Sequence, residues 1–138
     1  MATQTGATLK GYFNTGDQPT ESNFEDLIDS SLNLIASHET VEGGNGGGSA
    51  TALSITTSIS FITTATNKSH VSLADGTTGQ IKHIIHKTRS NSVDLVITPA
   101  NLSAGSTLTS NLGGRGCTLI FDGTNWQVLG DVGEFVIA

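Results

Sequence analysis

The sequence predicts a mainly β fold, namely a small antiparallel β-sandwich, jelly roll or barrel, with one amphipathic helix near its N-terminal end. Charged residues make up only 13% of the chain, while Gly alone contributes 17 residues. Short segments that alternate apolar and hydroxyl-bearing residues follow one another from about residue 50, with turn residues between them. Helical spacing of apolar residues is confined to one stretch before them. Many short strands joined by tight turns are typical of sandwiches and barrels.

The helix is predicted over about residues 20–37, within an N-terminal arm that spans residues 1–42. Thr20 is the expected N-cap, and acidic residues follow it where the helix dipole favours negative charge. A helix of about four turns is marginal alone, so its apolar stripe needs a partner surface. The stripe follows three-and-four spacing and consists of Phe24, Leu27, Ile28, Leu32, Leu34 and Ile35.

Residues 43–49, with the sequence GGNGGGS, are predicted to form a flexible linker. The β domain would then span residues 50–138. A helix on such a tether packs well against copies of itself or against another protein. This linker is therefore the reason for treating the helix as an assembly element rather than as a layer of the β domain.

Short strands are expected through the β domain, and residues 99–111 are expected to form a loop. Residues Cys117 to Leu129 predict a hairpin with its turn at Asp122 and Gly123. Phe121 and Trp126 are its predicted structural anchors, although an exposed Trp126 would instead offer a stacking platform for a sugar. The strands are predicted at residues 52–57, 59–64, 70–73, 80–87, 93–98, 117–122, 126–129 and 134–137.

The negative charge is concentrated in the N-terminal part. Residues 1–47 carry seven acidic residues against Lys10, a balance equal to the net charge of −6 for the whole chain. An acidic helix does not bind phosphate backbones, so no nucleic-acid partner is expected. No apolar run approaches the length of a membrane span, so no membrane partner is expected either. Cys117, the single cysteine, is expected to be a small apolar strand residue.

No catalytic motif is present, and we predict that the chain is not an enzyme and has no cofactor. His83 and His86 point to opposite faces if they lie on one strand, which disfavours a metal pair. A trimer axis remains a way to gather three copies of one histidine. The glycines at residues 113–116 lack phosphate-loop spacing, so a turn is expected there.

Four segments carry a family resemblance. Residues 9–33, LKGYFNTGDQPTESNFEDLIDSSLN, contain an aromatic pair, Thr-Gly-Asp, Pro-Thr, a Phe and Leu-Ile-Asp-Ser. The β region contains LADGTTGQIKHIIHK, DLVITPANLSAGSTLT and GCTLIFDGTNWQVLG. Together these segments, which cover most of the chain, resemble virion structural proteins of tailed phages, including trimeric capsid decoration and fibre-like proteins. The motifs mark virion parts rather than one particular part.

The resemblance implies a homotrimer that binds other virion proteins, with the major capsid protein as the expected partner. In such a trimer, the stripe residues Phe24, Leu27, Ile28, Leu32 and Ile35 would pack around the axis. Tyr12, Phe13 and Asp17 are the expected particle-docking residues. The chain has no long repetitive shaft, which favours a capsid decoration protein or short head fibre over a tail fibre. The implied location is the capsid surface of a virion assembled in the host cytoplasm.

Two other functions remain open. A tail-fibre or baseplate module that binds a receptor or host glycan would need Trp126, Tyr12 or the histidines exposed in a groove. A depolymerase would need paired carboxylates in a cleft. The β domain offers only Asp75, Asp94, Asp122, Asp131 and Glu134, and three of these lie in expected turns.

Overall fold

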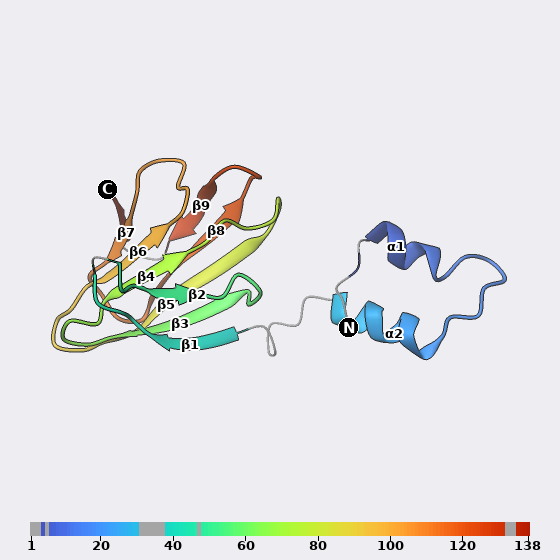
Figure 1. Cartoon of the computed structure of the whole chain (residues 1–138), viewed down its shortest axis with the longest axis horizontal. Coiled ribbons are helices and arrows are strands. Elements are labelled where there is room, and N and C mark those ends of the chain that lie inside the picture. Colours follow the sequence, from blue (N-terminus) through green and yellow to red (C-terminus); the bar gives the residue numbers. More distant parts are fainter. Residues whose placement is uncertain (1–3, 5, 31–37, 47, 132–134) are drawn as a thin grey trace. The chain divides into compact units, whose positions relative to one another are not determined.

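The computed structural model describes residues 4, 6–30, 38–46, 48–131 and 135–138. The chain divides into two compact units, Met1–Ala36 and Ser37–Ala138. We call them the helical unit and the β unit. Figure 1 shows the helices in the first and the strands in the second.

The helical unit contains α1 (Gly6–Gly11) and α2 (Glu21–Ser30). The predicted helix over 20–37 is confirmed for the part that α2 covers, and residues 31–37 lie outside the described residues. Helix α1 is not predicted by the sequence pattern. Its sequence GATLKG begins and ends with glycine, which has low helix propensity, and it offers no apolar stripe.

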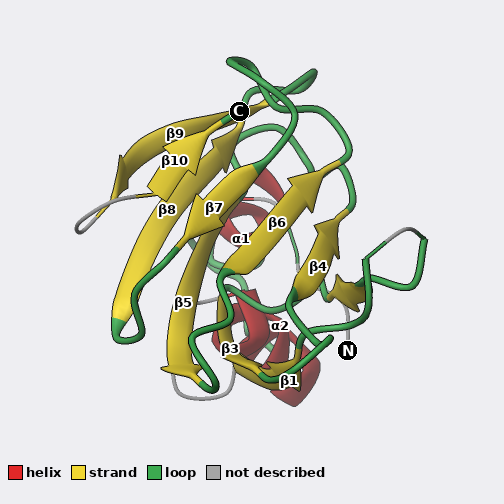
Figure 2. Cartoon of the chain, turned by 90° about the vertical axis from the view of Figure 1, so that its left-hand side faces the viewer, coloured by secondary structure: helices red, strands yellow, loops and turns green. Residues whose placement is uncertain are grey.

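The β unit is a sandwich of two five-stranded sheets. Sheet A has the strand order β1-β3-β5-β8-β9, and sheet B has the order β10-β7-β6-β4-β2. Figure 2 shows the layer with β4, β6 and β7 lying over the layer with β3, β5 and β8. The strands are β1 (His38–Glu42), β2 (Thr51–Leu53), β3 (Ile59–Thr64), β4 (His70–Leu73), β5 (Ile81–Arg89), β6 (Leu95–Pro99), β7 (Leu108–Ser110), β8 (Arg115–Phe121), β9 (Trp126–Asp131) and β10 (Phe135–Ile137).

The first six strands wind as a coil. Successive strands alternate between the sheets, so that β1, β3 and β5 run parallel in sheet A while β2, β4 and β6 run parallel in sheet B. The last four strands pair antiparallel and complete both sheets. The β-sandwich is thus confirmed, but its sheets are mixed rather than antiparallel. Alternating burial has the same period of two in both kinds of pairing, so the pattern alone did not distinguish them.

The glycine-rich segment is part of the sandwich, which corrects the predicted linker. Residues 43–49 follow β1, and the division between the units falls earlier, after Ala36. Gly43 N–H donates to Thr63 O at 3.0 Å, while Gly44 and His70 exchange backbone hydrogen bonds of 2.8 and 2.9 Å. A Cβ on Gly44 would overlap the Ser49 carbonyl oxygen. These two glycines therefore allow the chain to cross from sheet A to sheet B close to its own backbone.

The core lies between the sheets and is formed by the inward residues of both. Strand β3 alternates half-buried and buried side chains along its whole length, as expected for one face against a core. Trp126, Leu119 and Leu95 are fully buried in it. Cys117 is also buried there, which confirms its apolar role.

Candidate functional site: an apolar patch on the helical unit

Helix α2 begins at a hydrogen-bonded cap. Asn23 N–H donates to Thr20 Oγ1 at 3.3 Å, and Thr20 N–H donates to Asn23 Oδ1 at 2.9 Å. This reciprocal pair is a capping box in which Asn takes the position usually held by Glu or Gln. Thr20 is therefore confirmed as the N-cap. The cap fixes the residue at which the helix begins. The apolar stripe therefore starts within the first turn, at Phe24.

The described stripe residues are exposed within their unit. Phe24, Leu27 and Ile28 are 49%, 38% and 66% exposed. Phe13, which is 43% exposed, meets Phe24 edge to face with ring centroids 5.8 Å apart. We call these four residues the helical patch. Leu32 and Ile35, the other predicted assembly residues, lie outside the described residues.

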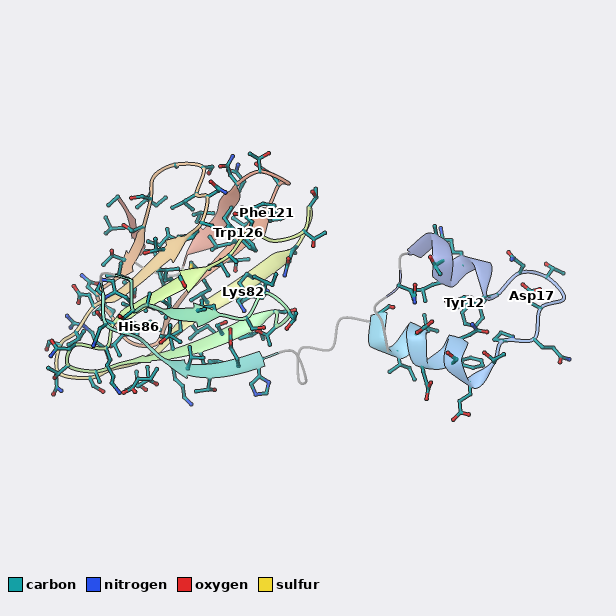
Figure 3. The ribbon with its side chains drawn as sticks, viewed as in Figure 1. Tyr12, Asp17, Lys82, His86, Phe121 and Trp126 are labelled. Atoms are coloured by element: carbon teal, nitrogen blue, oxygen red, sulfur yellow. The ribbon has the colours of Figure 1, made fainter. Side chains whose placement is uncertain are left out.

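The three predicted docking residues have different environments. Phe13 belongs to the helical patch, whereas the Tyr12 hydroxyl donates to Asp26 Oδ2 at 3.0 Å. This hydrogen bond to a carboxylate raises the pKa of Tyr12. Tyr12 thus ties the segment after α1 to α2. Asp17 is exposed in a turn, where its N–H donates to Asn14 O at 3.0 Å, and Figure 3 shows it away from Tyr12.

Trp126 and Phe121, the predicted anchors of the β8–β9 hairpin, are both buried. Trp126 is 0% exposed, and its Nε1–H donates to Ala74 O at 3.0 Å. Its ring lies 5.2 Å from that of Phe121, and Figure 3 shows the two side by side. The Asp122 carboxylate closes the turn by accepting from the backbone of Thr124 and Asn125, each at 2.8 Å. A buried Trp126 is not available to stack on a sugar.

Lys82 is a buried cation that the sequence analysis missed. It is 0% exposed, and its Nζ donates to Ser54 O at 2.7 Å, Thr57 O at 2.8 Å and Thr57 Oγ1 at 2.9 Å. Glu39 Oε1 lies 3.3 Å from Nζ. Burial lowers the pKa of Lys82, and the nearby Glu39 carboxylate partly opposes that shift. Lys82 thereby joins β5 to β1 and to the loop between β2 and β3.

His86 lies at the centre of a second buried polar cluster. Its Nε2 is 3.0 Å from Thr64 Oγ1, and its Nδ1 is 3.4 Å from Ser110 Oγ. Burial is the main cause that lowers the pKa of His86. A hydroxyl beside an imidazole is the arrangement of an activated nucleophile. All three side chains are 0% exposed, however, so a substrate cannot reach them and the cluster is structural.

A polar hollow of about 550 Å³ lies beside His70, near the crossing between the sheets. Its walls combine amide, hydroxyl and imidazole groups with apolar surface. One wall is close-fitting, because a Cβ on Gly46 would come within 2.9 Å of the His70 ring. The described lining residues are Asn45, Gly46, Thr66, Asn67, Ser69, His70 and Val93.

His83 and His86 point to opposite faces of sheet A, as predicted, since His86 is buried and His83 half-buried. Across the described residues, no group of three or more His, Cys, Asp and Glu side chains is placed to hold a metal ion. None of the described helices is long and apolar enough to cross a membrane.

No family model matches the chain, and no curated protein matches it significantly.

Proposed function

We propose that this protein is a virion structural protein of a tailed phage, a homotrimeric capsid decoration protein or short head fibre that binds the shell. Its function is assembly rather than catalysis. The resemblance of residues 9–33 and of the β-unit segments to phage virion proteins supports this proposal.

The helical patch is the observation that carries the proposal. Among the described side chains of the helical unit, only that of Asp26 is buried, and it is polar. Phe13, Phe24, Leu27 and Ile28 therefore have no apolar core among the described residues of their unit. Apolar side chains gathered on so small a unit are stabilised when a partner removes them from water. Three copies of the patch around one axis supply such a partner.

A decoration protein gains affinity from repetition. Each copy on a capsid buries a modest surface, and the linked copies of a trimer bind as one multivalent ligand. Asp17, which follows Tyr12 and Phe13 in the sequence, is exposed and is available for docking on a basic neighbour in the shell.

Two measurements test the proposal. Light scattering on the purified chain at micromolar concentration should give three times the mass of 14.2 kDa. A reconstruction of the virion that contains this chain should show its density on the capsid surface. A monomer at all concentrations contradicts the trimer, while density at the tail or baseplate contradicts the capsid location.

The polar hollow beside His70 favours a second candidate, a receptor- or glycan-binding module. Asn45, Asn67 and His70 place amide and imidazole groups on one concave surface, which suits a ligand rich in hydroxyl groups. Titration with purified host surface polysaccharide should then show binding that Asn45→Ala weakens at least tenfold. Asn125→Ala, in the distant β8–β9 turn, is the matched control. No saturable binding by the unmodified chain excludes this candidate.

A further inference from the structure

The wall of the polar hollow contains a reactive pair of neighbouring residues, Asn45 and Gly46. Glycine follows Asn45 and no other asparagine of the sequence. Both residues are exposed, and both line the hollow together with His70. Glycine has no Cβ to shield its backbone nitrogen, and it restricts rotation of the main chain least. The pair therefore presents an amide carbon and an unhindered backbone nitrogen that can join into a five-membered ring.

Backbone contacts hold this pair beside the start of β4. Gly44 and His70 exchange backbone hydrogen bonds of 2.8 and 2.9 Å, and Asn45 forms an antiparallel bridge with Ser49. A Cβ built on Gly46 would lie only 2.9 Å from His70 Cε1 and 3.1 Å from His70 Nε2. The imidazole therefore lies directly against the main chain of Gly46, at the nitrogen-bearing residue of the pair.

The imidazole of His70 is also oriented by a neighbour. Its Nδ1 is 3.0 Å from Ser69 Oγ, so Nε2 is the nitrogen that we assign to proton exchange with the loop. An imidazole titrates near neutral pH, where it can take up a proton from one group and return it to another. His70 thus supplies, beside Gly46, the proton carrier that ring closure requires.

We propose that Asn45 is a site of spontaneous deamidation in which His70 carries the proton. Gly46 N forms a bond to Asn45 Cγ, and the bond from Cγ to Nδ2 breaks. His70 Nε2 takes the proton from Gly46 N–H and delivers it to Nδ2, which leaves as ammonia. Water then opens the cyclic imide at either carbonyl, so that aspartate and isoaspartate form at this position. The step needs no oxidant and no reactant other than water.

His70 is the titratable group that faces the reacting atoms. The described lining of the hollow contains no Asp, Glu, Lys or Arg. The charged residues nearest to it in the sequence are paired with one another: Glu42 with Lys68 at 2.7 Å, and Asp94 with Arg89 at 2.6 Å. The pH dependence of the reaction should therefore follow the His70 ring.

Deamidation would change the hollow with the age of the protein. Either product places a carboxylate in a described wall that is otherwise uncharged, and isoaspartate also lengthens the main chain beside the crossing between the sheets. This inference goes beyond the proposed function and does not rest on it, because the reaction needs neither a capsid nor a second copy.

Incubation of the purified full-length chain, followed by peptide mapping with mass spectrometry, tests the proposal. The peptide that contains Asn45 should acquire the mass of an acid and separate into two forms. Asn91, which precedes Ser92, is the internal control, because its Nδ2 donates to Thr66 Oγ1 at 2.9 Å. It should convert at least tenfold more slowly. Asn45→Gln keeps the amide but lengthens the side chain, so it should abolish the signal.

Substitution of the histidine tests its part in the reaction. His70→Gln should slow conversion at least threefold and remove the rise in rate that accompanies loss of the ring proton between about pH 5 and 8. His83→Gln, at a half-buried histidine on the outer face of sheet A, is the matched control and should keep both. Emission from buried Trp126 reports whether each variant keeps its fold. If His70→Gln does not, Ser69→Ala, which releases the ring, should slow conversion instead.

Two results would overturn the proposal. One is conversion of Asn45 no faster than that of Asn91. The other is a folded His70→Gln variant, or Ser69→Ala in its place, that keeps the rate and the pH dependence of the unmodified chain. Neither result bears on the homotrimer or on binding to the shell, so the proposed function is judged separately.

Discussion

At the residue scale, β5 contributes two buried polar side chains, Lys82 and His86, each at the centre of a hydrogen-bonded cluster in the interior. Lys82, Ile84 and His86 all point inward, while Ile81, His83 and Ile85 point outward. Strand β5 therefore mixes polar and apolar residues on both faces. The sequence shows that Lys82 faces inward, because in an alternating strand it lies on the same face as Ile84, two residues further along. The role of Lys82 depends on its partner Glu39, which is distant in sequence and follows the predicted helix.

The buried imidazole of His86 predicts acid sensitivity. Its pKa in the folded state is lowered, chiefly by burial and next by Arg89, with Asp94 opposing. Above about pH 6.5 the ring is neutral in both states and has no effect. As the pH falls from there to the lower folded pKa, the unfolded state takes up the proton first, so stability decreases. The slope approaches about 1.4 kcal/mol per pH unit.

Urea unfolding between pH 7.5 and 5 measures this slope. His86→Gln should flatten it, even though the variant is less stable at every pH. His70→Gln, which changes a half-buried histidine beside the polar hollow, should keep it. An equal slope in the His86→Gln variant and the unmodified chain would mean that another group causes the acid sensitivity.

Removing the charge opposite Lys82 should be costly. Glu39→Gln keeps the size of the side chain but leaves a buried ammonium without its counter-charge, and we expect a loss of about 3 kcal/mol in the free energy of unfolding. Glu42→Gln is the matched control. Glu42 pairs with Lys68 at 2.7 Å, but the two side chains are 49% and 52% exposed, so the loss there should stay below about 1 kcal/mol. Equal losses in the two variants would contradict a special role for the Lys82 cluster.

At the element scale, the sequence predicted the strands that alternate cleanly and missed those that do not. Strands β3 and β4 match their predicted bounds of 59–64 and 70–73. Strand β1 was missed because HETVE carries two acidic residues, and its only inward apolar side chain is Val41. Strand β7 has three residues, too few to show a period within the loop predicted at 99–111.

The crossing at Gly43 and Gly44 shows why the linker prediction was wrong. A glycine-rich composition indicates flexibility when the backbone is free, but here the same residues serve close approach. A flexible linker and a closely packed crossing differ only in their tertiary contacts, here with residues 68–70. The local sequence pattern gives no indication of those contacts. The same limitation hid the parallel coil, since strand pairing is set by where each connection returns.

Gly44→Ala should therefore destabilise the β unit. The added methyl group meets the Ser49 carbonyl and comes within 2.7 Å of Thr51 N, and such overpacking costs about 1–3 kcal/mol. Gly130→Ala is the control, because nothing lies within 4 Å of its Cβ position, and it should change stability by less than about 0.5 kcal/mol. Thermal unfolding followed by far-UV circular dichroism compares them. A neutral Gly44→Ala would restore the view of this segment as a linker.

At the scale of the whole molecule, the described apolar core and the exposed helical patch belong to different units. The β unit holds the described apolar core and both buried polar clusters. The described helical unit holds apolar side chains that lack such a core. The sequence predicted an exposed stripe separate from the β domain, although it placed the boundary several residues too late. Spacing alone predicted that Phe24, Leu27 and Ile28 form one helical stripe, because such a stripe is a local pattern that does not depend on tertiary contacts.

If the helical patch holds the proposed trimer, charge in the patch should weaken that trimer without unfolding the β unit. In the monomer, Ile28→Asp or Phe24→Asp places the carboxylate on an exposed surface, where it is well solvated. In an assembled helix–helix interface the same carboxylate is buried without a partner, which costs several kcal/mol. A cost of about 4 kcal/mol lowers the association constant about a thousandfold. Ser22→Asp, at an exposed polar position of the same helix, is the matched control and should leave the trimer intact. Light scattering follows the mass, while thermal unfolding follows the β unit, whose transition should not move. A β-unit transition that shifts with Ile28→Asp would show that α2 stabilises the sandwich, and the helical patch would then be part of a core rather than an assembly surface.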